Sequence, residues 1–109
     1  MASGGIEQRV YQLVPAGETV DVDFVPANGD IVQLTKIGVN TPTANDNIGL
    51  IVWDPSGANE IILSCSGNTD QLTGRSFTGN GTKPLRITLI NPGPTDAYMG
   101  AYFMGQYNG

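Results

Sequence analysis

The chain has 109 residues, of which ten are acidic, five are basic and none is histidine, giving a formal net charge of −5. Without histidine there is no Ser-His-Asp or Cys-His catalysis, and no histidine-ligated metal site. The single cysteine, Cys65, excludes an internal disulfide framework and a thiolate zinc cluster. The acidic balance argues against binding to nucleic acid or to an anionic membrane surface, because both attract clusters of lysine and arginine.

The first eight residues differ in character from the rest of the chain. Residues 1–8 are mostly polar and contain two glycines, so we expect a flexible N-terminal arm there and one folded domain over 9–109. The start of the chain lacks the basic and apolar regions of a secretory signal, which predicts synthesis in a cytoplasm. No apolar stretch approaches the roughly 20 residues that a membrane-spanning helix needs.

From residue 9 onward, short apolar segments alternate with turns rich in Pro, Gly and Asn. In the second segment, valine and phenylalanine alternate with Asp21 and Asp23, which is the pattern of a half-buried strand. Gly38 is a candidate β-bulge in the third segment. The predicted strands, in chain order, are 9–14, 19–25, 31–39, 48–53, 60–66, a weaker strand within 71–78, 85–90 and 98–107.

These eight short strands, with tight turns between them and no apolar stripe of helical period, indicate an all-β protein. We expect an antiparallel β-sandwich with jelly-roll or Greek-key connections. A small closed β-barrel is the alternative architecture.

Candidate chemical groups are few. Asp21 and Asp23 share one face of a strand at roughly 7 Å, and paired carboxylates can hydrolyse glycosides, but their alternation with apolar residues is that of a solvated strand face. The loop at 45–47 and Asp54 concentrate the oxygen ligands that calcium prefers, yet their spacing matches no EF-hand and such residues are common in turns. No serine has a histidine or a plausible lysine base. We therefore expect no enzymatic activity, no cofactor and no metal.

Two predicted strands are apolar on both faces, although a sandwich strand needs only one apolar face to reach the core. Trp53 and Leu50 lie on opposite phases of one strand, and Phe103 and Tyr102 lie on opposite phases of the other. Either a partner covers the outer phases, or Trp53 and Phe103 fill the core while tyrosines lie singly outside. Tyr and Trp are favoured at protein interfaces and also stack on sugars. The candidate partner-binding residues are Ile6, Trp53, Tyr98, Tyr102, Met104 and Tyr107.

In the order and composition of its predicted strands, the chain resembles the small all-β virion proteins of tailed bacteriophages that act as capsid decoration, cement or stapling proteins. The features that carry the resemblance are the arm 1–8, the segment 14–20, the Trp-Asp-Pro-Ser-Gly turn within 52–57, and the ending 85–91 followed by 98–107.

This resemblance implies a non-enzymatic structural protein on the capsid exterior of a virion, made in the host cytoplasm. Its partner would be the major capsid protein or another virion protein, reached by the arm or loops, and it would assemble as a dimer or trimer without nucleic acid or membrane. The alternative is a carbohydrate- or host-surface-binding module, free or in a phage tail, because jelly-rolls are common lectin scaffolds. A third hypothesis is that the protein is a bacterial adhesion or assembly subunit.

Overall fold

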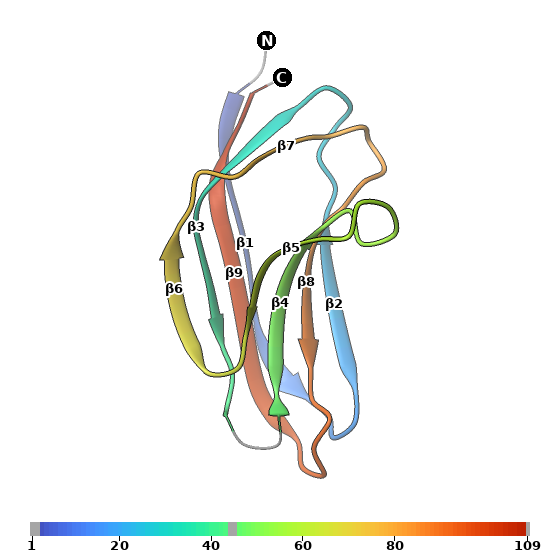
Figure 1. The fold of residues 1–109 in the computed structure, drawn as a ribbon, viewed down its shortest axis with the longest axis vertical. Helices are drawn as coiled ribbons and strands as arrows, with labels where there is room; N and C mark the ends of the chain where they lie inside the picture. Colours follow the sequence, from blue (N-terminus) through green and yellow to red (C-terminus); the bar gives the residue numbers. More distant parts are fainter. Residues whose placement is uncertain (1–2, 44–45, 109) are drawn as a thin grey trace.

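The computed structural model describes residues 3–43 and 46–108. In this part of the chain, two antiparallel sheets pack face to face without closing into a barrel (Figure 1). The sandwich prediction is therefore confirmed and the barrel alternative is wrong. The strands are β1 (Ser3–Val14), β2 (Thr19–Phe24), β3 (Ile31–Asn40), β4 (Ile48–Trp53), β5 (Glu60–Cys65), β6 (Asn68–Leu72), β7 (Ser76–Thr78), β8 (Leu85–Ile90) and β9 (Ala97–Asn108).

The strand order is that of a jelly-roll. One sheet has the order β1-β9-β3-β6, with β7 also pairing with β3, and the other has the order β2-β8-β4-β5. Most connections cross from one sheet to the other, so strands distant in sequence become neighbours. The first and last strands lie side by side, with Ser3 opposite Asn108, and both chain ends are at the same end of the molecule (Figure 1).

Alternation of inward and outward side chains along the strands builds one hydrophobic core between the sheets. In β9, Met99, Ala101 and Phe103 point inward and are at most 4% exposed, while the residues between them face outward. From the other sheet, Ile51 and Ile87 meet them and are fully buried. The core cluster comprises Val14, Val32, Leu34, Ile37, Val39, Ile51, Trp53, Leu63, Phe77, Leu85, Ile87, Leu89, Met99, Ala101 and Phe103.

The N-terminal arm is the main correction to the predicted organisation. Residues 3–8 form the first half of β1, and each lies opposite a residue of β9, as Ile6 does with Gly105. Ile6 also packs against the core cluster. The alternation of Ile6 and Val10 with charged residues continues the strand pattern, and backbone pairing with β9 overrides the local glycines. Residues 1 and 2 of the predicted arm lie outside the described residues.

The β-bulge in β3 lies at a different residue from the predicted one, and it coincides with a break in the neighbouring edge strand. The pairing with β9 shifts register between Leu34 and Lys36, so the extra residue is Thr35 and not the predicted Gly38. The neighbouring edge strand breaks at the same level: β6 pairs with the chain after the bulge and β7 with the chain before it. The single strand predicted within 71–78 is therefore two strands.

Removing the central core side chain tests this packing. We expect Phe103→Ala to lower the free energy of unfolding by about 3–5 kcal/mol, because the ring is fully buried between the two sheets. Ile61→Ala, at a position that is 55% exposed, should cost less than about 1 kcal/mol. Urea unfolding followed by tryptophan fluorescence measures both, and equal losses in the two variants would contradict the core assignment.

Candidate functional site

The outer face of the β1–β9–β3–β6 sheet carries most of the exposed aromatic residues. Tyr98, Tyr102 and Met104 occupy the outward phase of β9, opposite in phase to buried Phe103. The prediction that this strand is apolar on both faces is therefore confirmed. β9 lies between β1 and β3, so its outward side chains sit at the middle of the sheet and not at its edge.

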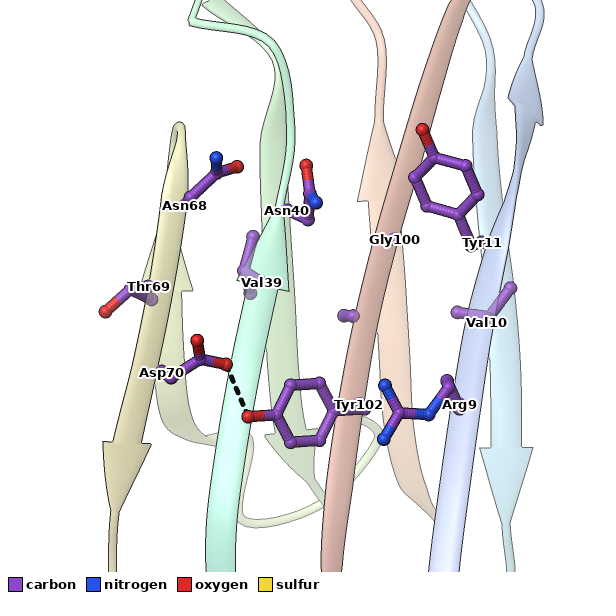
Figure 2. A pocket seen from close by; sticks show the side chains of 11 residues that line it. Arg9, Val10, Tyr11, Val39, Asn40, Asn68, Thr69, Asp70, Gly100 and Tyr102 are labelled. Atoms are coloured by element: carbon purple, nitrogen blue, oxygen red, sulfur yellow. Dashed lines mark hydrogen bonds between the residues drawn. The ribbon is translucent and has the colours of Figure 1, made fainter.

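One row of residues crosses four strands of this face. Arg9 on β1 lies opposite Tyr102 on β9, Tyr102 lies opposite Gly38 on β3, and Gly38 lies opposite Asp70 on β6. The guanidinium carbon of Arg9 is 4.7 Å from the centroid of the Tyr102 ring, within cation–π range. The Tyr102 hydroxyl donates a hydrogen bond to the Asp70 carboxylate (Figure 2).

Gly38 makes this row possible. A Cβ at position 38 would overlap the Tyr102 ring and the Asp70 carboxylate, so only glycine lets the ring lie across β3 and reach β6. The ring in turn covers backbone that glycine leaves bare. The row holds Tyr102 in one position, with a cation at one end and a carboxylate at the other.

The same contact changes the acidity of Tyr102. The hydrogen bond to Asp70 raises the pKa of the Tyr102 hydroxyl above its ordinary value of 10.0, and desolvation and the charge of Asp70 act in the same direction, against a smaller opposing effect of Arg9. Because the folded-state pKa is raised, this contact stabilises the fold below the unfolded tyrosine pKa. The contribution is lost as the pH rises through the folded-state value.

A groove of about 350 Å³ lies beside this row. Figure 2 shows Tyr11 and Tyr102 on either side of Gly100, with Asn40 and Asn68 extending the wall across the sheet. A Cβ on Gly100 would lie 2.8 Å from a ring carbon of Tyr11, so this glycine also makes room for an aromatic side chain. The groove therefore combines aromatic surface with amide, carboxylate and guanidinium groups.

Further apolar surface borders the groove. The Tyr11 and Tyr98 rings stack at a centroid distance of 5.9 Å and an interplanar angle of 14°, and their residues are 62% and 59% exposed. Leu13, opposite Tyr98, is 42% exposed. Leu72 is 86% exposed on the edge strand β6, farther along the same face at the level of Met104. We call this surface the tyrosine face and define it by its residues Tyr11, Leu13, Leu72, Tyr98, Tyr102 and Met104.

The structure separates the six predicted partner-binding residues. Tyr98, Tyr102 and Met104 lie together on the tyrosine face. Ile6 and Tyr107 point to the inner side, pack against the core cluster and line a second groove of about 280 Å³, at the end of the molecule where β1 begins and β9 ends.

Trp53 is corrected. It is 7% exposed, belongs to the core cluster and stacks on Phe77 at a centroid distance of 5.0 Å. Its burial removes it from any surface that a partner reaches. The outward phase of β4 is instead formed by Ile48, Leu50 and Val52, of which Val52 is buried and the others are half-buried.

Sequence reasoning missed Tyr11, Leu13 and Leu72. The signal for Tyr11 and Leu13 was present, because both share the phase of Arg9 in the first predicted strand and alternate with Val10 and Val14. Leu72 gave no such signal, because it ends a strand whose other residues are polar.

The acidic residues considered for chemistry have structural partners. Asp21 accepts a hydrogen bond from the Thr88 hydroxyl at 2.7 Å, and Asp23 accepts two from the Arg86 guanidinium, at 2.7 and 3.0 Å. The bond to Asp23 raises the pKa of Arg86. Asp54 accepts from the backbone N–H of Ala58 within its own turn.

The described residues contain no group of three or more Cys, Asp or Glu side chains that could hold a metal ion. Asn45, part of the calcium-like loop, lies outside the described residues. None of the helical segments in the described ranges is long and apolar enough to span a membrane.

No family model matches the chain, and no curated protein matches it. Two solved structures are similar in arrangement. The Drosophila NLP core, described for pentamer formation and histone binding, shares 10% identity over 93% of this chain and 98% of that chain, with a TM-score of 0.48. A Bacillus endospore appendage, from a family of disulfide-linked pili, shares 10% identity over 98% of this chain and 89% of that chain, with a TM-score of 0.47. At these values we draw no conclusion from either likeness.

The raised pKa of Tyr102 gives a direct test of the four-strand row. We expect Asp70→Asn to lower the pKa of Tyr102, because an amide accepts a weaker hydrogen bond from the hydroxyl than a carboxylate does and lacks the negative charge that opposes ionisation of the phenol. Absorbance at 295 nm follows tyrosinate formation, and circular dichroism verifies that the protein stays folded over the range. Tyr102→Phe should remove from the titration the tyrosine whose pKa Asp70→Asn lowers. An Asp70→Asn titration that superimposes on the native one would contradict the contact between Tyr102 and Asp70.

Proposed function

We propose that this protein is a non-enzymatic structural protein that acts by binding another protein through the tyrosine face. What supports the proposal is the exposure of Tyr11 and Tyr98, whose rings stack on the outside of a regular sheet, with Leu72 exposed farther along the same face. Exposed apolar patches on soluble proteins mark interaction surfaces. Tyrosine is also the residue type that interfaces favour, since it contributes a large contact area with few rotatable bonds.

The fixed position of Tyr102 adds to this proposal. A side chain that is already held by Arg9 and Asp70 loses little conformational freedom when a partner covers it. Ordering costs of about 0.5–1.5 kcal/mol per mobile side chain are thereby avoided. The charges around it are mixed, with Arg9 and Lys36 near Asp70 and Glu7, so a partner surface with both signs of charge fits this face.

The specific partner we propose is a major capsid protein, which makes the chain a decoration protein on a virion. This part of the proposal is supported by the resemblance of the sequence to phage decoration and stapling proteins. The contact surface differs from the one the sequence suggested, because residues 3–8 are strand and not a free arm. The proposed contact is accordingly a sheet face.

A second candidate function is carbohydrate binding, and one observation favours it. The Tyr11–Tyr98 stack lies beside a groove whose walls include Asn40, Asn68 and Asp70. Aromatic rings that stack on sugars next to amide and carboxylate groups that bind hydroxyls form a glycan site on many β-sandwich scaffolds.

Substitution on the tyrosine face tests the proposed function. Tyr98→Ser and Leu72→Ser should each weaken binding to shells assembled from the major capsid protein of the same genome by about tenfold or more, because each removes exposed apolar contact area. Co-sedimentation with purified shells measures the affinity.

Ile61→Ser is the matched control, since Ile61 is 55% exposed but lies on the other sheet, and it should bind shells like the native protein. Native affinity in both tyrosine-face variants would contradict the proposal. Absence of shell binding together with glycan binding that Tyr11→Ala abolishes would establish the second candidate instead.

A further inference from the structure

β1 is a long edge strand with one side free. It pairs with β9 along its whole length, from Ser3 opposite Asn108 to Val14 opposite Ala97, and no described strand pairs with its other side. The backbone groups on that side are a template for another strand. Natural edges are usually protected by short strands, bulges, proline or charged side chains, especially lysine. β1 has twelve residues, no lysine or proline, and no register shift against β9, and its two charged residues, Glu7 and Arg9, have opposite signs and pair with each other.

The other edges in the described structure differ from β1. β2 and β5 have six residues each, and β5 meets its neighbour with a register shift. The fourth edge is interrupted between β6 and β7. β1 is therefore the longest and most regular edge that the described residues offer to another strand.

We propose that a second copy of this chain pairs with β1, antiparallel and two-fold symmetric about Gln8. Symmetric antiparallel pairing places residues with the same phase opposite one another. About Gln8, Glu7 of one copy faces Arg9 of the partner subunit, and the reverse contact forms on the other side of the axis. Within one chain these two side chains, both more than half exposed on the outer face, pair with each other at 2.9 Å. The register about Gln8 therefore sets two such ion pairs side by side, with opposite charges facing across the axis.

The neighbouring registers are disfavoured by charge. An axis at Glu7 would set the two Glu7 side chains directly opposite each other, and an axis at Arg9 would do the same with two arginines. Like charges in directly opposed positions destabilise strand pairs, whereas opposite charges stabilise them. Of these three registers, only the one centred on Gln8 puts opposite charges together.

The remaining pairs fit this register. Gly5 faces Tyr11 of the partner subunit, and a Cβ built on Gly5 meets only the Gly105 carbonyl oxygen, at 3.9 Å. The Tyr11 ring lies over Gly100 of its own subunit and stacks on Tyr98, so no bulky side chains collide at this pair. On the inner side, Ile6 faces Val10 of the partner subunit, and both are partly buried apolar residues. The two sheets would then continue into one another, from Ser3 to Leu13 of each copy.

This pairing does not rest on the proposed capsid contact, because it uses the edge of the sheet and leaves the tyrosine face uncovered. It places the tyrosine faces of two subunits side by side on the same surface. A partner with repeated sites would then be bound through two faces at once, which raises the overall affinity without any new contact.

Charge exchange tests the register. Glu7→Arg alone and Arg9→Glu alone should each raise the dimer dissociation constant by about tenfold or more, because each places like charges opposite one another twice. The double exchange E7R/R9E again places opposite charges across the axis and should return the dimer dissociation constant to within about threefold of the native value. Sedimentation velocity measures the constant, and Glu18→Arg, in the turn after β1, is the control with the same charge change.

Cysteine cross-linking tests the axis itself, in a Cys65→Ser background. Gln8→Cys should form a disulfide-linked dimer on oxidation, because directly opposed strand residues lie within disulfide range. Gln12→Cys, in the same strand and phase, should not, because residue 12 faces Gly4 of the partner subunit. A native protein that stays monomeric at 100 μM, a trimer, a double exchange that fails to restore dimerisation, or equal cross-linking at both positions would overturn the proposal.

Discussion

The position of β9 between β1 and β3 is the constraint on which the rest of the structure depends. One phase of this strand places Phe103 and Met99 in the core, and the other places Tyr98 and Tyr102 on the outer surface. Because pairing on both sides fixes its register, the backbone positions of the exposed tyrosines are fixed together with those of the core residues. A shift of one residue would exchange the two sets and lose both. Packing and surface chemistry are thus set by the same backbone hydrogen bonds.

Glycine has a particular role in this arrangement. At Gly38 and Gly100 the missing side chain lets the rings of Tyr102 and Tyr11 lie along the sheet. The rings in return shield backbone that would otherwise be open to water. The outcome is an aromatic surface beside a groove of about 350 Å³, in which Arg9 and Asp70 hold Tyr102 from opposite sides. Such a surface suits recognition of another surface better than enclosure of a small substrate.

Much of the fold could be predicted from the sequence, because alternation of apolar residues with period two survives in most strands. The class and the sandwich follow from strand number and turn spacing, whereas the choice between jelly-roll and Greek-key connections comes from the observed strand order. Residues 3–8 could not be placed in the same way, since Gly4 and Gly5 weaken the local pattern and only the long-range pairing with β9 orders them. For the site, phase alone could not say which of two apolar faces is inside. Trp53, a candidate partner-binding residue for which the sequence also allows a place in the core, is therefore located only by the structure, which buries it.

The central claim is that the tyrosine face is covered when the protein is in its native assembly. Hydroxyl-radical footprinting of the free protein and of intact native particles measures this directly. The account predicts that Tyr98, Tyr11 and Leu72 lose reactivity in the particle while Ile61, on the opposite sheet, keeps it. Unchanged reactivity of Tyr98 and Leu72 in the particle, with protection elsewhere, would contradict it.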